Sequence, residues 1–542
     1  MRPIRRCIAS LCLALALAPC ASANTITVRG SREAAIMHAI DRSRPGDTIA
    51  LGARVYALTE ALRPKSGTKL IGAGAGRTVL RHRSEQPSPL IDLSGRQHVE
   101  VARLTLDGAS NPQASQGILA TRSRWLNLHH LAISNLVKSS AFGPHGIHFT
   151  GDGSVPDTGV TDSVISDCTF ENIGVDAQYG AAIRLSYDSS RNRVIRNRIH
   201  NTGRGGILCD NACTDVVIQH NVVSGSGGEG LSIEVWNHCD RAVIEDNRVD
   251  HWISVGGSNL CAVRRNDIRD GSGVFKSYGI EGIGRHIIVT DNTVGDGQQI
   301  GISVSSGIPD YCFYGYNTVR DAIQWGAELY GDEDGITHQY FYRCTFADTS
   351  VGRGHPMYPG DEGNGFRALG KVGHLVFEEC RFVDNGRFGV QMLGDGVDAL
   401  SFVRCHTTRN KERAVVGPAT YSALEWVACQ VEGNGDNSLP ANKPFAEPAP
   451  VAAFDAPAVA RAGEPVTFDS RSSAASGQIA SLLWDFGDGP PAIGPTAVHV
   501  YQHPGTYRVT LIVWDTDGRA ARAERRIRVS ALSGRKPRLG GS

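Results

Sequence analysis

Gly206-Ile207-Leu208, followed by Val217-Ile218-Gln219-His220-Asn221, is one copy of a pattern that recurs along the chain. The next copy reads Gly230-Leu231-Ser232 with Val243-Ile244-Glu245-Asp246-Asn247. In each copy a glycine-led apolar triplet precedes an alternating stretch that ends in Asn or Cys. These Asn and Cys residues stand at 168, 197, 221, 247, 266, 292, 317, 344, 380, 405 and 429, so successive copies are 19 to 36 residues apart.

A repeat of this length indicates a solenoid. Alternation with period two makes its segments strands, and the lack of helical patterns excludes repeats that alternate strands with helices. Three short strands with sharp turns describe one coil of a parallel β-helix, stacked about 4.8 Å from the next coil. The recurring Asn suits a buried turn there, because its amide can donate to and accept from the Asn one coil away. The sequence therefore predicts an all-β solenoid.

The repeat resembles the pectate-lyase-like right-handed parallel β-helix superfamily over roughly residues 25–435. The segment Arg44-Pro45-Gly46-Asp47-Thr48-Ile49, followed by Tyr56 and Gly72-Ala73-Gly74, is similar to the N-terminal cap of that superfamily. The resemblance implies a right-handed parallel β-helix, which we place at residues 24–438. The chain lacks the Asn-Thr-Asp, Asp-Asp and Gly-His-Gly set of polygalacturonases and the Asp-Pro-His-Asp segment of mannuronan epimerases, so no single activity is implied.

A second domain is expected at the C-terminal end. Residues 439–450 are rich in Pro and predict a semi-rigid linker. Beyond them, Trp484-Asp485-Phe486-Gly487-Asp488-Gly489 and Pro504-Gly505-Thr506-Tyr507 resemble the polycystic-kidney-disease (PKD) type domain. This resemblance implies a small immunoglobulin-like β-sandwich at 451–530, with a frayed tail at 531–542. Because the linker is Pro-rich, we expect the β-helix to fold without this module.

The N-terminal segment predicts export. Arg2, Arg5 and Arg6 precede an apolar run, and Ala21-Ser22-Ala23 offers a cleavage site, which indicates a signal peptide at residues 1–23. The protein is then secreted or periplasmic. No later stretch approaches the about 20 apolar residues of a transmembrane segment. Lys+Arg and Asp+Glu both total 55, and a net charge of zero argues against nucleic acid as a partner. We expect a monomer.

The cysteines fall into two groups. Cys344, Cys380, Cys405 and Cys429 take the Asn position on four consecutive coils and are expected to be small packing residues. Cys213 and Cys239 each lie eight residues before the recurring Asn, in what we expect to be surface turns of adjacent coils. A disulfide between these two is as plausible as two free thiols.

The triplets also predict which side chains face outward. Their alignment gives an outer column of His148, Arg184, Leu208, Ser232, Ser254, Glu281, Ser303, Gln324, Arg367 and Gln391, and a second column of Thr150, Ser186, Asp210, Glu234 and Gly256. Asp210 and Glu234 are thus expected in register, with carboxylates about 5 Å apart. Such a pair suits a retaining acid and nucleophile, shared Ca²⁺ ligation, or simply two solvated acids.

Cations near these acids suggest a second chemistry. In β-elimination from a uronic acid, a cation neutralises the carboxylate and a base removes the proton at C5. Lys276, Arg184 or Tyr278 could be that base, and ordinary surface charge is the alternative for each. The candidate catalytic residues are Arg184, Asp210, Glu234, Lys276, Tyr278 and Glu281, and the candidate substrate-binding residues are His148, Tyr179, Trp236, Trp252, Gln324 and Arg367.

The sequence thus favours an exported polysaccharide-active enzyme that cleaves an acidic glycan on the outer face of the β-helix. A lyase is preferred to a glycoside hydrolase of the same fold. The alternative from another class is a non-catalytic glycan-binding or cell-surface adhesive protein. Polysaccharide is the expected partner, and Ca²⁺ at Asp210 and Glu234 is the one cofactor considered.

Overall fold

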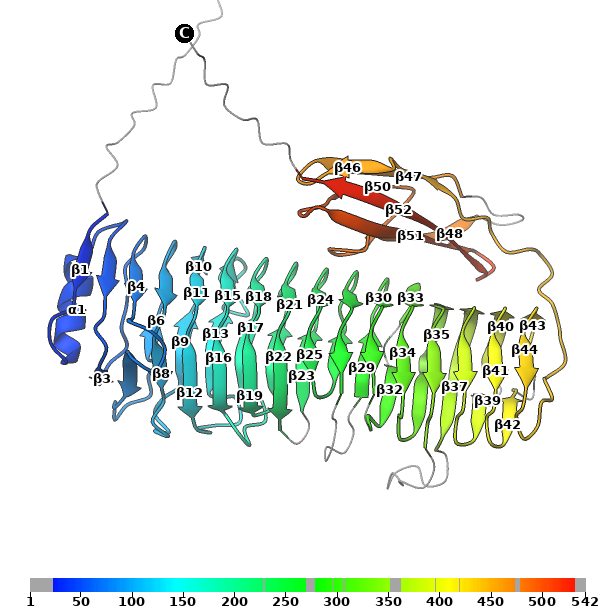
Figure 1. Cartoon of the computed structure of the whole chain (residues 1–542), viewed down its shortest axis with the longest axis horizontal. Coiled ribbons are helices and arrows are strands. Elements are labelled where there is room, and N and C mark those ends of the chain that lie inside the picture. Colours follow the sequence, from blue (N-terminus) through cyan, green and yellow to red (C-terminus); the bar gives the residue numbers. More distant parts are fainter. Residues whose placement is uncertain are drawn as a thin grey trace, which may run out of the picture.

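The computed structural model describes residues 23–531, except 228–229, 270–277, 296, 306, 308, 351–361, 395, 419 and 473–477. Within these residues the chain forms a long parallel β-helix with a C-terminal β-sandwich beside it (Figure 1). Both predicted architectures are confirmed. Residues 1–22 of the predicted signal peptide, most of the predicted tail and Lys276 lie outside the described residues.

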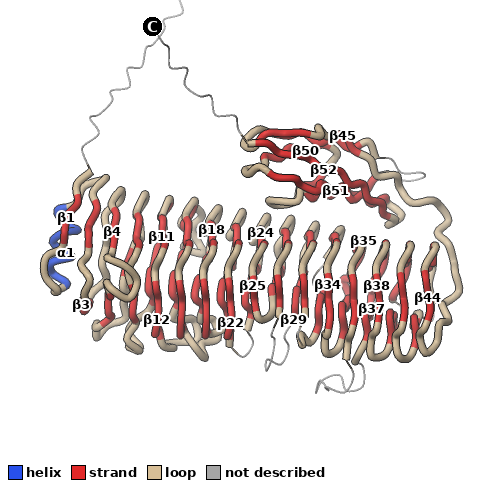
Figure 2. The backbone as a smooth tube through the Cα atoms, in the orientation of Figure 1, coloured by secondary structure: helices blue, strands red, loops and turns tan. Residues whose placement is uncertain are grey.

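From β6 onward each coil contributes to all three stacks of parallel strands, and the tube in Figure 2 shows the successive coils. The first sheet consists of β6 (Ile91–Asp92), β9 (Gln116–Ala120), β13 (His145–Thr150), β17 (Ala181–Ser186), β20 (Gly205–Asp210), β23 (Leu231–Trp236), β26 (Ile253–Gly256), β29 (Tyr278–Ile283), β32 (Ile300–Ser305), the beginnings of β35 (Trp325–Tyr342) and β37 (Asn364–Glu378), β39 (Phe388–Leu393) and β42 (Arg413–Val416).

The second sheet follows the first in each coil. It consists of β1 (Thr25–Thr27), β2 (Thr48–Ala50), β4 (Lys69–Ile71), β7 (Glu100–Ala102), β11 (Asn127–His129), β15 (Val164–Ser166), β18 (Arg193–Ile195), β21 (Val217–Gln219), β24 (Val243–Glu245), β27 (Ala262–Arg264), β30 (Ile288–Thr290), β33 (Cys312–Gly315), the ends of β35 and β37, β40 (Val397–Val403) and β43 (Leu424–Val427). The short strands β10 (Ser123–Arg124) and β14 (Val160–Thr161) pair beside it.

The third sheet closes each coil. It consists of β3 (Val55–Leu58), β5 (Val79–His82), β8 (Thr105–Asp107), β12 (Ala132–Leu136), β16 (Thr169–Ile173), β19 (Arg198–Thr202), β22 (Val222–Ser226), β25 (Arg248–Val249), β28 (Asp267–Ile268), β31 (Thr293–Val294), β34 (Thr318–Arg320), β36 (Thr345–Ala347), β38 (Arg381–Val383), β41 (His406–Thr408) and β44 (Gln430–Glu432). Alternate side chains of all three sheets point into one continuous apolar core.

The predicted Asn column forms a buried ladder at the turn between the second and third sheets. Asn221 donates its side-chain amide to Asn247 Oδ1 at 3.0 Å and to the Val194 carbonyl at 2.9 Å. The same bond recurs from Asn197 through Asn221, Asn247, Asn266 and Asn292 to Asn317. The turn therefore has its polar groups satisfied inside the core, which is why Asn recurs there.

We expect Asn247→Ala to destabilise the β-helix strongly. It would leave the main-chain and side-chain N–H groups of Asn221 without their acceptor, at about 1–3 kcal/mol for each buried unpaired group. The exposed Asn127→Ala on β11 is the control and should change stability by less than about 0.5 kcal/mol. Equal denaturation midpoints for the two variants would contradict a structural role for the ladder.

The cysteines are all free thiols among the described residues. Cys344, Cys380 and Cys405 are buried in the ladder position, as predicted. Cys213 and Cys239, for which a disulfide and two free thiols were equally plausible, are free thiols in the structure. Both are fully buried, and each thiol donates to a main-chain carbonyl of its own turn, at 3.3 and 3.2 Å. The two residues lie one coil apart, and the Cys213 main-chain N–H donates to Cys239 Sγ at 3.3 Å.

Both ends of the β-helix are covered. At the N-terminal end α1 (Glu33–Arg42) buries Ile36, Ala39 and Ile40 against the first coil. At the other end, residues 441–445 of the predicted linker pair with the last coil. Lys443 and Leu424 exchange two main-chain hydrogen bonds of 2.8 Å, and Tyr421 donates to the Ala441 carbonyl. This part of the linker is therefore a cap rather than a spacer.

The C-terminal sandwich has two sheets. One consists of β45 (Phe454–Asp455), β47 (Pro465–Ser470) and β50 (Thr496–Val500), and the other of β46 (Val459–Arg461), β52 (Ala520–Ser530), β51 (Gly505–Asp515), β48 (Ile479–Asp485) and β49 (Ala492–Ile493). A core of its own, centred on Trp484, joins them. The sandwich therefore meets the usual requirement of a domain, an independent apolar core.

The sandwich lies against the second sheet of the β-helix (Figure 1). One apolar cluster is shared between the domains, and its members are Ile288, Phe313, Tyr340, Tyr342 and Val376 from the β-helix with Leu483, Ile512, Trp514 and Ala520 from the sandwich. Removal of the module after residue 440, which the sequence predicted to leave an intact rod, would expose this surface and also remove the cap.

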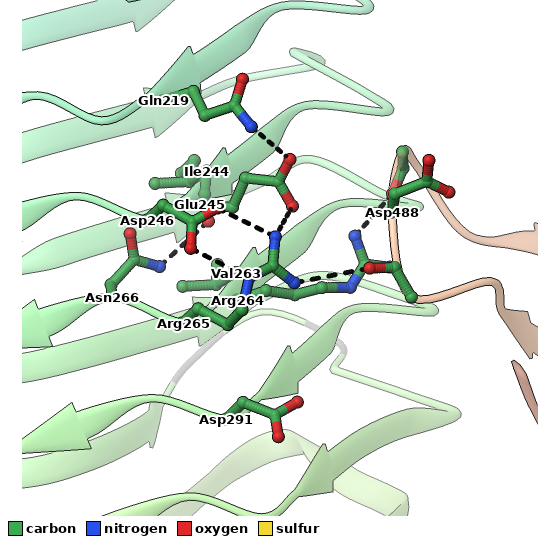
Figure 3. A network of polar contacts seen from close by, with 12 residues as sticks. Gln219, Ile244, Glu245, Asp246, Val263, Arg264, Arg265, Asn266, Asp291 and Asp488 are labelled. Atoms are coloured by element: carbon green, nitrogen blue, oxygen red, sulfur yellow. Dashed lines mark hydrogen bonds and ion pairs between the residues drawn. The ribbon is translucent and has the colours of Figure 1, made fainter. Parts of the chain in front are cut away.

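A buried ion pair fixes the contact. Arg264 of β27 donates to Asp485 Oδ1 at 2.7 Å and to the Gly489 carbonyl at 2.6 Å, and the two side chains are 1% and 3% exposed. Figure 3 shows Arg264 extending from the β-helix to the turn that carries Asp488. Arg508 of the sandwich pairs with Asp291 of the β-helix in the same region. The Asp-Phe-Gly-Asp-Gly turn thus serves as a docking element.

Candidate functional site

The strand register defines a central column of outward-facing side chains on the first sheet. From coil to coil its members are His148, Arg184, Leu208, Glu234, Ser254, Glu281, Ser303, Glu328, Arg367 and Gln391. The predicted column is correct except at two coils, where Glu234 and Glu328 stand in place of Ser232 and Gln324. Asp210 is in register with Trp236, so the predicted pairing of Asp210 with Glu234 on adjacent positions is wrong.

The error has a physical origin. Ser232 occupies the position that Gly206 has in the preceding coil, whereas the triplet alignment put Gly230 there. A shift of two residues keeps every side chain on its correct face and therefore leaves the alternation of apolar and polar residues intact. Periodicity alone cannot detect it.

Arg184 and Asp210 form an ion pair on this face. The guanidinium donates to Asp210 Oδ2 at 2.6 and 3.1 Å. The other carboxylate oxygen, Oδ1, is buried and has no hydrogen-bond partner within the described residues. Burial raises the pKa of Asp210, against the lowering effect of Arg184. Arg184 and Asp210, both predicted on the outer face, are thus in contact, and the cation is already neutralised by this carboxylate.

Glu234 pairs with Arg204, a residue that the sequence reading missed. The guanidinium binds both carboxylate oxygens, at 2.8 and 3.1 Å. Arg204 also lies 5.8 Å from the ring centre of Tyr179, which in turn stacks on Phe142. Arg204 stands directly before β20, in the turns that vary most, so only the register reveals its partner. Tyr179, a predicted substrate-binding residue, therefore flanks the same carboxylate.

Glu281 lies in a nearly closed environment. Its Oε2 accepts from Ser254 Oγ at 2.7 Å and from the Trp252 indole N–H at 3.2 Å. Tyr278 packs against Trp252, with ring centres 4.7 Å apart. Burial raises the pKa of Glu281 above the usual carboxyl range, although these two hydrogen bonds lower it. The candidate residues Trp252, Tyr278 and Glu281, which the sequence proposed separately, are thus brought together in the structure.

The remaining predicted residues have structural partners. His148 shares a hydrogen bond of 3.1 Å with Ser186, and burial lowers the pKa of His148 to about 3, so it is neutral. Gln324 is fully buried, where it accepts from Gln299, so it does not belong to the outer column. Arg367 pairs with Glu328 at 3.3 Å.

Trp236 is the most exposed of the predicted site residues that the structure describes. It stands two positions after Glu234 on β23, and 46% of it is accessible. A Cβ placed on Gly256, its neighbour in the next coil, would be 2.2 Å from the indole ring. The indole therefore lies against the main chain of Gly256, with room made by the missing side chain.

The described residues do not form a metal centre of three or more His, Cys, Asp or Glu side chains. Asp210 and Glu234, the predicted Ca²⁺ ligands, each face an arginine instead of sharing a space. Because Ca²⁺ requires six to eight oxygen ligands, this arrangement does not favour the ion.

The carboxyl groups suit acid–base chemistry. Glu234 and Glu281 stand in the same column with Ser254 between them, so two coil spacings separate their main chains, about 9.6 Å. In inverting glycosidases the two carboxyl groups are about 6.5–9.5 Å apart and leave room for a water molecule, a range close to this main-chain spacing. One member has a raised pKa and the other is an arginine-paired carboxylate, which is the asymmetry that an acid and a base require.

Two families match parts of the chain. Residues 90–268 match the right handed beta helix region, and residues 447–530 match the PKD domain. No helix among the described residues has the length and apolar character needed to cross a membrane.

Curated relatives share only a small part of their length. A microbial collagenase of Vibrio alginolyticus is 40% identical over 87 residues, which are 16% of this chain and 11% of the relative. Collagenase ColQ1 of Bacillus cereus (strain Q1) is 45% identical over 53 residues, or 10% of this chain and 6% of that one. The chain thus spans about a tenth or less of these relatives.

Among solved structures, the A-module of mannuronan C-5 epimerase AlgE6 from Azotobacter vinelandii is 15% identical. The match covers 75% of this chain and 95% of that one, with a TM-score of 0.38. The PKD1 domain of Vibrio anguillarum Epp is 29% identical over 16% of this chain and 99% of that one, with a TM-score of 0.15.

Proposed function

We propose that this chain, a right-handed β-helix with a C-terminal PKD domain, is an exported enzyme that cleaves a polysaccharide on the outer face of its first sheet. The observation that carries the proposal is the pair Glu281 and Glu234, an acid with a raised pKa two coils from an arginine-paired carboxylate. Indole and phenol rings beside both residues offer faces on which sugars stack.

The roles follow from the environments. Protonated Glu281 gives its proton to the glycosidic oxygen as the C1–O bond breaks. Glu234 removes a proton from a water molecule whose oxygen forms the new bond to C1. Arg204 holds the Glu234 carboxylate in place through two hydrogen bonds. The product is a new reducing end with inverted configuration at C1.

These contacts favour hydrolysis over the β-elimination that the sequence suggested. Elimination needs a cation to neutralise the uronate carboxylate. Arg184, Arg204 and Arg367 instead pair with acids of the protein itself. Lys276, the other predicted cation, lies outside the described residues.

The test is incubation with polygalacturonate, alginate, xylan and α-1,3-glucan, following reducing ends and ultraviolet absorbance separately. We expect new reducing ends without absorbance from at least one polymer. Absorbance that rises with the reducing ends would establish a lyase in place of the hydrolase. Retention on a polymer without either signal would establish a binding protein and overturn the enzymatic proposal.

A further inference from the structure

Four ring side chains stack at the surface where the C-terminal domain meets the β-helix. They are His286, Tyr311, His338 and His374, and the strand register puts them at equivalent positions of four successive coils of the second sheet. Their ring centres are 5.5, 4.4 and 4.9 Å apart, and neighbouring ring planes differ by 12, 16 and 7°. We call these four residues the ring column.

The C-terminal domain covers the beginning of the ring column. His286 Nε2 shares a hydrogen bond of 3.0 Å with Ser481 Oγ of β48. The Tyr311 ring meets the Trp514 indole of β51 edge-on, with ring centres 5.5 Å apart. These rings therefore become accessible to solvent when the domain leaves the β-helix.

His374, at the other end of the ring column, has the tightest contact with the domain. A Cβ added to Gly518 would be 1.9 Å from His374 Nδ1, so any larger residue at position 518 would collide with the imidazole. The Nδ1 atom is buried and has no hydrogen-bond partner among the described residues. Because both nitrogens of a protonated histidine are donors, a proton on this ring would leave a buried N–H without an acceptor.

The carboxylates around the ring column are occupied by other donors. Asp310 binds His338 at 2.7 Å. Asp398 accepts from two main-chain N–H groups of its own domain, and Asp515 binds Arg519 at 2.7 Å. Within the described residues, none of the three carboxylates is hydrogen-bonded to the histidine at either end of the column. A charge on either end histidine would therefore lack a dedicated counter-charge.

Burial lowers the pKa of both end histidines. For His286 the carboxylate of Asp310 opposes this effect, and the guanidinium of Arg285 adds to it. For His374 the imidazole of His338 adds to the effect of burial, and the surrounding carboxylates oppose it. Both end histidines therefore favour the neutral form in the docked protein, whereas an exposed histidine has a pKa of about 6.5.

We propose that the ring column makes the docking of the C-terminal domain sensitive to acid, so that the domain is held at neutral pH and opens more often as the pH falls toward about 5. The open state exposes the end histidines and binds protons more readily than the docked state. The docked state therefore keeps its full stability above the exposed pKa, about 6.5, and loses stability as the pH falls below that value. This inference is independent of the proposed function, because the ring column belongs to the second sheet and Glu281 to the first.

The test measures how often the domain opens. Ala520→Cys places a thiol in the apolar cluster shared by the two domains, where residue 520 is 8% exposed, so an alkylating reagent reaches it only after opening. Labelling of the peptide that contains residue 520 is followed by mass spectrometry between about pH 7.5 and pH 5, where histidine titrates and ordinary carboxyl groups stay ionised. The rate is divided by that of the unfolded protein at the same pH, which gives the open fraction. Circular dichroism verifies that the β-helix is folded at each pH.

We expect the open fraction to rise by about tenfold or more over this range, since each histidine that stays neutral down to pH 5 in the docked state favours opening by up to about 30-fold. His286→Gln can keep the hydrogen bond to Ser481, and His374→Phe keeps a flat ring. Each substitution alone should give a smaller rise, and the two together a rise of less than about threefold. The matched control is His200→Gln, because His200 is exposed on the third sheet, and it should leave the rise unchanged.

The rise in the open fraction within each protein is the quantity compared, so a variant that opens more at neutral pH remains informative. A full rise that persists in the double variant would overturn the ring column as the sensor. An open fraction that does not change with pH in the parent protein would overturn acid-sensitive docking altogether. Neither result depends on whether the protein cleaves a glycan.

Discussion

Glu281→Gln is expected to reduce glycan cleavage by about 100-fold or more while the protein remains folded. The loss is the usual contribution of a general acid. The amide oxygen of Gln can still accept from Ser254 Oγ and the Trp252 indole, so the local hydrogen bonds survive. The control is Glu171→Gln on the exposed face of the third sheet, which should cleave at the wild-type rate.

The pH dependence gives a second check on Glu281. Its raised pKa means that the acid form persists above the usual carboxyl range, and activity should fall as pH rises through that raised value. In the folded protein this carboxyl prefers its proton, so its contribution to stability is complete at low pH and is lost as pH rises through the folded pKa. Gln cannot ionise, so the variant should become more stable relative to wild type as pH rises. A constant difference in melting temperature would contradict this.

Arg264→Ala is expected to release the C-terminal domain from the β-helix. Breaking a buried ion pair by removing one partner typically destabilises by about 3–5 kcal/mol, because the remaining charge stays buried without compensation. Here that charge is Asp485, whose side chain is 3% exposed. Once the contact opens, Trp514 of the shared apolar cluster becomes accessible to solvent.

Small-angle scattering and the fluorescence of Trp514 measure this release. Arg196→Ala is the matched control, because Arg196 also pairs with a carboxylate on the β-helix but both groups are at the surface, where such a pair contributes about 0–1 kcal/mol. In a double-mutant cycle, Asp485→Asn should cost much less in the Arg264→Ala background than alone. Additive losses would show that the pair does not hold the domains together.

Much of the fold could be predicted from the sequence because each coil of a solenoid meets the same local structural requirements. The Asn ladder, the glycine-led triplets and the inward Ile residues of successive coils each satisfy the same requirement many times, so their spacing identifies the coil. The central column of the first sheet could be predicted for the same reason, except at the coil where Ser232 takes the position that Gly206 has in the preceding coil. There the periodicity is indifferent to a two-residue shift, so Arg204 and Glu234 were not matched to their correct neighbours. Gln324 was placed in the column instead of Glu328, a shift of four residues that also keeps the face.

Contacts between segments that are far apart in the sequence could not be predicted from it. Arg264 and Asp485 are 221 residues apart, and neither lies in a sequence pattern from which its partner can be predicted. The turn around Asp485 does resemble that of its family, but the resemblance concerns the sandwich and not the surface on which it docks. Cys213 and Cys239 are on adjacent coils, as their spacing predicted. The spacing left open whether they form a disulfide, and the structure has them as free thiols in contact.

Docking against the second sheet determines how the molecule carries load. The chain leaves the β-helix at its last coil and returns to it at Arg264, so everything between residues 264 and 485 forms a loop closed by the ion pair and the apolar cluster. Tension applied to β52 enters the rod over the coils of β27 to β37, which carry Arg264 and the shared apolar cluster, rather than at β43. The coils between the docking surface and β43 then carry no tension, so unwinding from the C-terminal coil requires that the docking contact breaks first. The docked domain therefore carries the load in place of the C-terminal coils.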